Sequence, residues 1–372
     1  MINCLHIAND FSLTKVHKNL YSRLDGLGIS QTIFNPVREN TPVGNNSILF
    51  KHPDSEIIYS ESLKKYHRIF FRNKINFLYR DLQLKCNLKQ INIIHATTLY
   101  SDGALALKVH KEFNIPYIVA VRGTDVSLFL KYRPDLIFLL KEILLNANQI
   151  IFLGESLQKQ LFKNKFIKPL QPKLKSKIQV ICNGVDDYWL ANIKPIKKIR
   201  PKKILYIGRF DKNKNTINLI EAILFLRKEY PNLKLDLVGR GGGDEEEVIN
   251  LSNKYKNFIN FIGPIYNNEE LKKIYLSNDI FAMPSHSETF GLVYIEALSQ
   301  GLPVLCSKNQ GIDDTFRFKV GEFVNPKSIE SIAKGIKEII VNYDSNNLNK
   351  IDFSQFSWDN IAMNYLELYK KT

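Results

Sequence analysis

Two acidic residues separated by seven others, Glu288 and Glu296, stand where a predicted strand passes into a predicted helix. The apolar run 280–283 predicts the strand, and residues 290–301 predict the helix, which a glycine and a proline terminate. Free N–H groups at a helix N-terminus, together with the positive end of its dipole, form a seat for phosphate. Both carboxylates would therefore flank one ligand and accept hydrogen bonds from its hydroxyl groups.

A ligand with hydroxyl-rich groups on both sides of a phosphate matches this arrangement, and a nucleotide-sugar has that form. Between the two glutamates lie Phe290, Gly291 and Leu292, at the predicted helix start. Two glutamates at an arbitrary spacing would instead be a solvated loop residue and a surface helix residue. The residue types alone leave both interpretations open.

Cations and glycines follow two further predicted strands. Gly208, Arg209 and Lys214 come after the apolar run 204–207, and Gly239 begins a glycine-rich turn after the next strand. Glycine lets the backbone approach a ligand, and two fixed cations would neutralise a departing diphosphate. By itself, such a basic loop would simply be solvated. A dinucleotide-binding fingerprint is excluded at Gly239, because the Gly-x-Gly-x-x-Gly spacing is absent.

The first half of the chain alternates short apolar runs with helical patterns, which predicts β–α units around a parallel sheet. The candidate strands are residues 4–8, 29–34, 91–96, 117–121, 149–153 and 178–181. Arg122 and Asp125 follow the strand 117–121, at the sheet edge where open α/β proteins place their ligand sites. Their side chains would then point into a cleft, unless they pair with each other inside the loop.

Taken together, these segments resemble the retaining glycosyltransferases of family 4 (glycosyl transferases group 1), which have the GT-B fold. The stretch around Glu288 and Glu296 resembles the donor-site signature of that family, and Gly208-Arg209-x4-Lys214 resembles its Gly-Arg-x4-Lys motif. The Gly239 turn is similar to the Val-Gly-x-Gly loop. Residues 121–126 resemble the His-Gly-x-Asp loop, with arginine in place of the histidine. The resemblance is strongest over residues 200–372 and weakest over residues 1–90.

The resemblance implies an α/β protein of the GT-B type, with two Rossmann-like domains facing across an interdomain cleft. The expected division is a basic acceptor-binding domain over residues 1–192 and a linker over 193–203. A nucleotide-sugar-binding domain is expected over residues 204–355. A final helix over residues 356–372 would cross back to the first domain.

The resemblance also implies a role for each motif. Arg209 and Lys214, with the start of the helix at Phe290, would stabilise the departing diphosphate, so that neither a metal nor another cofactor is expected. Glu288 would orient the sugar and Glu296 the ribose. The expected catalytic residues are Arg209, Lys214 and Glu288. The remaining expected donor-site residues are Gly208, Gly239, Phe290, Gly291, Leu292 and Glu296, and Arg122 and Asp125 are expected on the acceptor side.

The positive charge of the chain is concentrated in its first half. The net charge is +15, and residues 1–200 hold 30 Lys and Arg against 15 Asp and Glu. Such a field suggests an anionic partner, either nucleic acid or an acidic membrane face. Residues 63–78 fit a basic aromatic helix lying on a membrane, and equally an ordinary helix with a solvated face. With the implied activity, we expect a lipid-linked glycan acceptor in the biosynthesis of cell-surface polysaccharide such as lipopolysaccharide, and no nucleic acid.

Composition places the chain among globular proteins, with 44% hydrophobic residues. The N-terminus lacks the pattern of a signal peptide, and no apolar run approaches the roughly 20 residues of a membrane span. We therefore expect a cytoplasmic protein, peripheral on the inner face of the plasma membrane. Three rival functions remain: a nucleotide-sugar epimerase of GT-B architecture, a nucleic-acid-binding protein, and a binding-only relative that the arginine at position 122 would allow.

Overall fold

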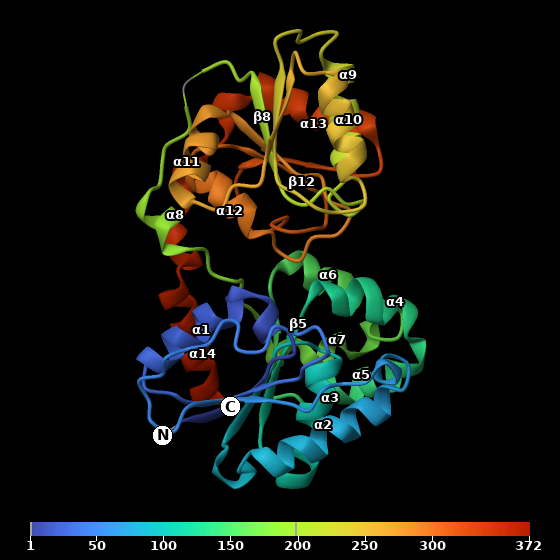
Figure 1. The fold of residues 1–372 in the computed structure, drawn as a ribbon, viewed down its shortest axis with the longest axis vertical. Coiled ribbons are helices and arrows are strands. Elements are labelled where there is room, and N and C mark those ends of the chain that lie inside the picture. The colour runs from blue at the N-terminus through green and yellow to red at the C-terminus, as the bar shows by residue number, and fades with distance from the viewer. Residues whose placement is uncertain (1, 198) are drawn as a thin grey trace. The chain divides into compact units, whose positions relative to one another are not determined.

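The computed structural model describes residues 2–197 and 199–372, and the chain divides into two compact units. Unit 1 comprises residues 2–153, Leu157–Gly184 and Trp358–Thr372, and unit 2 comprises Gly154–Ser156 and Val185–Ser357. Each unit contains one parallel sheet flanked by helices (Figure 1). The predicted class, an α/β protein with two Rossmann-like domains, is thereby confirmed. The roles assigned to the two domains stay predictions.

The sheet of unit 1 has seven parallel strands in the order β3-β2-β1-β4-β5-β6-β7. They are β1 (Asn3–Ile7), β2 (Ser30–Asn35), β3 (Glu56–Tyr59), β4 (Ile93–Ala96), β5 (Tyr117–Val121), β6 (Gln149–Phe152) and β7 (Ile178–Val180). Sequence patterns missed β3, a short strand at the edge of the sheet that pairs with β2. The other six overlap the predicted runs.

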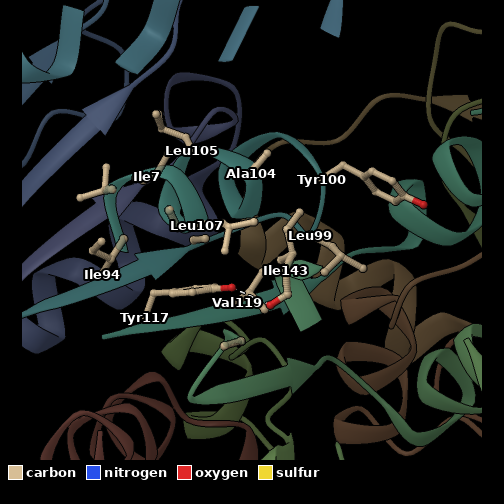
Figure 2. Packing of buried hydrophobic residues seen from close by; sticks show 14 of the residues in the cluster. Ile7, Ile94, Leu99, Tyr100, Ala104, Leu105, Leu107, Tyr117, Val119 and Ile143 are labelled. Atoms are coloured by element: carbon tan, nitrogen blue, oxygen red, sulfur yellow. Dashed lines mark hydrogen bonds between the residues drawn. The ribbon is translucent and has the colours of Figure 1, made fainter. Parts of the chain in front are cut away.

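Helices cover this sheet and bury its apolar strands. They are α1 (Lys15–Gly26), α2 (Phe71–Lys85), α3 (Ser101–Phe113), α4 (Leu130–Tyr132), α5 (Ile137–Asn146), α6 (Glu155–Phe162), α7 (Gln171–Leu174) and α14 (Trp358–Lys371). Figure 2 shows Ile94 of β4 and Val119 of β5 in one buried cluster with Leu107 of α3. Tyr117 joins the same cluster, and its hydroxyl donates to the carbonyl oxygen of Ile143 (2.6 Å). Strands covered on both faces in this way account for their continuous apolar runs.

The single helix considered for residues 63–78 does not form. A 3-10 turn at Lys65–Arg68 is followed by α2, and Phe70 between them leaves the helical conformation with ψ 78°. Leu63 is instead extended and pairs with Arg38 in an isolated bridge. Both alternatives assumed one helix over residues 63–78, and that prediction is wrong. Contact of this segment with a membrane stays a prediction.

The last helix, α14, lies beside α1 in unit 1 (Figure 1). Trp358, Ile361 and Tyr365 are buried in a cluster that also holds residues of α1 and β1. The hydroxyl of Tyr369 lies 2.9 Å from Nδ1 of His95, both buried. Unit 1 is thus built from both ends of the chain.

Unit 2 has six parallel strands in the order β10-β9-β8-β11-β12-β13. They are β8 (Lys203–Ile207), β9 (Lys234–Val238), β10 (Ile259–Gly263), β11 (Ile280–Ala282), β12 (Val304–Ser307) and β13 (Gly321–Val324). The helices are α8 (Asp187–Ala191), α9 (Thr216–Leu226), α10 (Glu245–Lys254), α11 (Asn268–Ser277), α12 (Leu292–Ser299) and α13 (Ile329–Val341). Across residues 2–197 and 199–372, none of the helices has the length and apolar character needed to cross a membrane.

Candidate active site

The strand order of unit 2 reverses between β8 and β11. In open α/β sheets, ligands bind beyond the carboxyl ends of the strands at such a switch point. The loop after β8 carries Arg209 and Lys214, and the loop after β11 carries Glu288. The topology therefore brings the loops of the two predicted motifs, about 80 positions apart in the sequence, to one edge of the sheet.

Backbone and side-chain hydrogen bonds hold these two loops against each other. The amide of Asn213 donates to the carbonyl oxygen of Ser287 (2.9 Å), and its side-chain oxygen accepts from the N–H of Ser287 (2.9 Å). The N–H of His286 donates to the carbonyl oxygen of Asn213 (2.7 Å). These paired bonds fix the relative position of the two loops.

The central contact of the site is an ion pair between Lys214 and Glu288. Nζ of Lys214 lies 2.6 Å from Oε2 of Glu288, and both side chains are mostly buried. The backbone of Glu288 is held at both ends, because its N–H donates to Oε1 of Gln310 (3.1 Å) and its carbonyl accepts from the N–H of Gly311 (2.9 Å). A partly desolvated ammonium in a fixed position is suited to binding a phosphate oxygen.

Arg209 is the other predicted cation, and within residues 2–197 and 199–372 its only ion pair is a long one to Asp211. Its side chain is 71% exposed, and its Nε lies 3.8 Å from Oδ2 of Asp211. The backbone at this position is fixed, since the hydroxyl of Tyr206 donates to the carbonyl oxygen of Arg209 (2.6 Å). The guanidinium donors therefore remain available to an anionic ligand.

Gly239 lets the loop after β9 approach the backbone of Gly208, in the loop after β8, closely. A Cβ built on Gly239 would stand 1.8 Å from the carbonyl oxygen of Gly208, and the φ of Gly239 is +144°. The contact continues along the loops, because the N–H of Phe210 donates to the carbonyl oxygen of Gly241 (2.7 Å). Only glycine fits at position 239 in this conformation.

A pocket of about 570 Å³ opens beside these glycines, within the usual size range of small-ligand sites. Its lining includes Gly208, Arg209, Gly239, Arg240 and Tyr266. The guanidinium of Arg240 lies 5.5 Å from the ring centroid of Tyr266, so a cation and an aromatic ring line one side together. The sequence analysis did not predict Tyr266 as a lining residue. Its position just after β10, at the same edge of the sheet, could have indicated it.

The helix after Glu288 begins two residues later than predicted. Gly291 precedes α12 in the left-handed conformation with φ +81°, and a Cβ there would meet the ring of Tyr294 at 2.6 Å. Leu292 is the first helical residue. The ring of Phe290 is buried against that of Phe356 (centroids 6.1 Å apart), which leaves only its backbone for the ligand role predicted for it.

Glu296 lies inside α12 and faces α11. Its Oε2 accepts a hydrogen bond from the hydroxyl of Tyr275 (3.2 Å). Burial raises the pKa of Glu296 to about 7, against the lowering effect of this hydrogen bond, and the nearby charge of Asp186 adds to the rise. Glu288 is thus tied to a cation, whereas Glu296 is partly protonated at neutral pH. That both flank one ligand stays a prediction.

Arg122 and Asp125 occupy the loop after β5 in unit 1. The carboxylate of Asp125 is buried and accepts the N–H groups of Arg122 (2.8 Å) and Leu99 (3.0 Å). Burial raises its pKa to about 6, and these hydrogen bonds oppose the rise. Nε of Arg122 donates to the carbonyl oxygen of Thr97 (2.8 Å). Asp125 therefore shapes the loop, and a role for either residue on the acceptor side stays a prediction.

Family models match nearly the whole chain. The model described as Glycosyltransferase Family 4 matches residues 15–188, and the model described as Glycosyl transferases group 1 matches residues 191–351. The chain belongs to glycosyltransferase family 4. The predicted family is thus confirmed.

Sequence relatives and solved structures agree with this membership. An uncharacterized glycosyltransferase of Methanocaldococcus jannaschii is 32% identical over 214 residues, which are 52% of this chain and 54% of that protein. Protein CapJ of Staphylococcus aureus is 25% identical over 96% of this chain and 93% of its own. The alpha-monoglucosyldiacylglycerol synthase of Acholeplasma laidlawii is 25% identical over 77% and 74% of the two chains.

Among solved structures, a sucrose-phosphate synthase from Thermosynechococcus elongatus superposes with a TM-score of 0.74 at 20% identity, covering 100% and 99% of the two chains. The apo form of the lipopolysaccharide outer core galactosyltransferase WaaB superposes with a TM-score of 0.72 at 15% identity over both full chains. At these identities the likeness establishes the fold, and the predicted GT-B type is confirmed.

Proposed function

We propose that this family 4 member is a retaining hexosyltransferase, which moves a sugar from a nucleotide-sugar to the hydroxyl group of an acceptor. The observation that carries the proposal is the Lys214–Glu288 ion pair at the switch point of unit 2. This ion pair lies at the same edge of the sheet as the exposed Arg209 and the pocket of about 570 Å³. A nucleotide would fill that pocket, and its diphosphate would meet the two cations.

In the proposed reaction, the bond between the anomeric carbon and the diphosphate oxygen breaks while a bond to the acceptor oxygen forms on the same face. The acceptor proton passes to the departing diphosphate. Arg209 and Lys214 would stabilise the negative charge that develops there, together with the N–H groups at the start of α12. Glu288 would orient the sugar hydroxyls and Glu296 those of the ribose. Because protein cations neutralise the diphosphate, the proposal includes no metal ion or other cofactor.

A thermal-shift screen of the purified chain with UDP, GDP, ADP and CMP, each alone and as its sugar derivative, tests the donor site. A ligand at 100 times its dissociation constant should stabilise the chain by about 2.7 kcal/mol. We expect one nucleotide to raise the melting temperature of the wild type, and Arg209→Ala to lose that shift. Lys234→Ala is the control, because Lys234 begins β9 at the opposite edge of the sheet. If no nucleotide raises the wild-type melting temperature, the donor-site proposal is wrong.

The acceptor we propose is a lipid-linked glycan of cell-surface polysaccharide biosynthesis, at the inner face of the plasma membrane. Two comparisons support this direction: one relative is named as a synthase of alpha-monoglucosyldiacylglycerol, and one structural neighbour as a lipopolysaccharide galactosyltransferase. The basic first half of the chain supports contact with an acidic membrane face.

A surface in unit 1 has the residue types for that contact. Phe138 and Phe166 are 79% and 47% exposed, and Nζ of Lys141 lies 5.9 Å from the ring centroid of each. Lys165 lies 5.0 Å from the ring of Phe166. Phe138 also lines an apolar groove of about 590 Å³ between α2, α3 and α5. Exposed rings surrounded by ammonium groups suit the headgroup boundary of an acidic bilayer.

Vesicle flotation of the full chain tests this surface, which consists of Phe138, Phe166, Lys141 and Lys165. The wild type should float with vesicles that contain acidic lipid and remain unbound with neutral ones. The double variant Phe138→Ser, Phe166→Ser should lose flotation, whereas Phe225→Ser, at a ring of unit 2 with 56% exposure, should keep it. Equal flotation of all three proteins would show that the membrane contact lies elsewhere.

A further inference from the structure

The sheet of unit 1 has a switch point of its own, between β1 and β4. Asn9 follows β1, and Thr98 and Asp102 follow β4. The side-chain amide of Asn9 donates to Oδ2 of Asp102 (3.1 Å) and to Oγ1 of Thr98 (3.4 Å). These hydrogen bonds join the two segments at the edge where a ligand of this sheet is expected.

A buried ammonium group lies at the same edge. Lys74 of α2 is 6% exposed, and its Nζ donates to Oγ of Ser101 (2.7 Å), next to Asp102. Over residues 2–197 and 199–372, Lys74 has no ion-pair partner in direct contact. An ammonium has three donors, so Lys74 can donate further hydrogen bonds to an incoming group. A buried cation without a direct counter-ion is costly, and a bound anion would offset that cost.

Arginines add to this positive charge. Arg38 follows β2. Burial lowers the pKa of Arg38, and the positive charge of Arg68 lowers it further. Arg122 follows β5, and it acts on Asp10 together with Arg38 and Lys74. Three cations from separate segments therefore lie at this edge: Arg38 after β2, Arg122 after β5, and Lys74, whose Nζ contacts Ser101 after β4. Like charges brought together in this way favour an anionic ligand.

Three carboxyl groups, those of Asp10, Asp102 and Asp125, also lie at this edge. Burial raises the pKa of Asp102 to about 7, although hydrogen bonds from Asn9 and Thr97 oppose the rise. Burial also raises the pKa of Asp10, although the positive charges of Arg122, Lys74 and Arg38 oppose the rise. Oδ1 of Asp102 is buried and accepts no hydrogen bond within the described part of the chain. Burial thus weakens the negative charge of these carboxyl groups, and it also lowers the pKa of Lys74 to about 8, so the ammonium form of Lys74 still dominates at pH 7.

We infer that this edge of unit 1 binds a phosphate group carried by the acceptor. The planar guanidinium group of Arg38 can offer paired donors, Arg122 keeps donors besides those it gives to Thr97 and Asn183, and Lys74 supplies a point charge. Asp10, which is half-buried, can accept a hydroxyl group next to the phosphate. The phosphate site follows from unit 1 alone, whereas its assignment to the acceptor rests on the proposed transferase function.

The test uses inorganic pyrophosphate as the probe, on the full chain whose donor site is first saturated with the nucleoside diphosphate found in the thermal-shift screen. Calorimetric titration should show binding to the wild type that weakens as salt is added. Arg38→Gln should lower the affinity by roughly tenfold or more, the range for a lost hydrogen bond to a charged group. Arg80→Gln, at an exposed arginine of the same unit, should bind like the wild type.

A second arm replaces pyrophosphate with vesicles that contain phosphatidic acid, to separate a soluble phosphate from a lipid headgroup. Binding of pyrophosphate that Arg38→Gln weakens supports a soluble phosphate ligand. Binding only to vesicles, again weakened by Arg38→Gln and not by Arg80→Gln, supports a phosphate at a lipid headgroup. Lys74→Gln should weaken the same probe. The inference is overturned if the wild type binds neither probe, or if Arg38→Gln binds as tightly as the wild type.

The outcomes also separate this inference from the proposed function. If a nucleoside diphosphate binds but neither phosphate probe does, the transferase proposal stands and the phosphate site is wrong. If no nucleotide binds, pyrophosphate is titrated into the chain without one. Weaker binding to Arg38→Gln than to the wild type then keeps the phosphate site and overturns its assignment to an acceptor.

Discussion

A buried carboxyl group at Glu296 makes the stability of the chain depend on pH. Burial raises its pKa from the ordinary 4.5 to about 7, so the folded chain holds this proton more tightly than the unfolded chain. The stability that Glu296 contributes is therefore fully present below about pH 4.5 and is lost as the pH rises through about 7. A shift of this size corresponds to about 3 kcal/mol.

Replacing Glu296 with glutamine removes this titration and keeps the size of the side chain. The free energy of unfolding of the wild type should fall between pH 5 and pH 8, and that of Glu296→Gln should not. The difference between the two proteins should therefore change by up to about 3 kcal/mol in favour of Glu296→Gln. Urea unfolding of both proteins at the two pH values measures the difference. The same free-energy difference between the proteins at pH 5 and pH 8 would contradict a raised pKa at Glu296.

Lys214 is the residue whose removal should affect nucleotide binding most directly. Lys214→Ala breaks its ion pair with Glu288 and removes one charged donor to the diphosphate, so the nucleotide affinity should fall roughly tenfold to a hundredfold. Calorimetric titration measures this affinity. Lys337→Ala is the matched control, because it breaks an exposed ion pair of the same unit (2.7 Å to Glu229) and should leave nucleotide affinity unchanged. If the two variants bind the nucleotide with equal affinity, Lys214 is not part of the donor site.

At the scale of elements, the close contact of the loops after β8 and β9 depends on one glycine. Gly239→Ala would place a methyl group within 1.8 Å of the carbonyl oxygen of Gly208, in a conformation that costs alanine about 1–3 kcal/mol by itself. We expect a lower melting temperature and loss of the nucleotide-induced shift. Gly243→Ala is the control, because its added methyl group meets nothing within 4 Å and its φ is not positive. Similar melting temperatures for the two variants would contradict the close packing.

At the scale of the whole molecule, the last helix completes the core of the first unit. Trp358 is 4% exposed in a cluster with α1 and β1, so Trp358→Ala should destabilise unit 1 by roughly 3–5 kcal/mol. Met363 lies on the exposed side of the same helix, and Met363→Ala should change stability by less than about 0.5 kcal/mol. In Trp358→Ala, the backbone amides of α1 and β1 should exchange hydrogen faster than in the wild type. Faster exchange confined to unit 2 would contradict the placement of α14 in unit 1.

The sequence by itself determined the fold class, the family and most of the strands. It also placed Arg209, Lys214 and Glu288 at one sheet edge, because each follows an apolar strand and parallel strands deliver the residues after them to the same edge. Their role in a donor site stays a prediction. That inference needs only the order of strand, loop and helix along the chain. Glycine at position 239 was informative for a related reason, since a positive φ restricts the residue type itself.

Tertiary structure alone decided which side chains are buried and what they contact. Three hydrogen bonds join segments that are far apart in the sequence. The hydroxyl of Tyr275 donates to Glu296, the N–H of Leu99 donates to Asp125, and the ammonium of Lys74 donates to Ser101. Local periodicity carries no information on such contacts. Because burial and partners set a pKa, the ionisation of Glu296, Asp125 and Lys74 follows from the folded chain and not from their residue types.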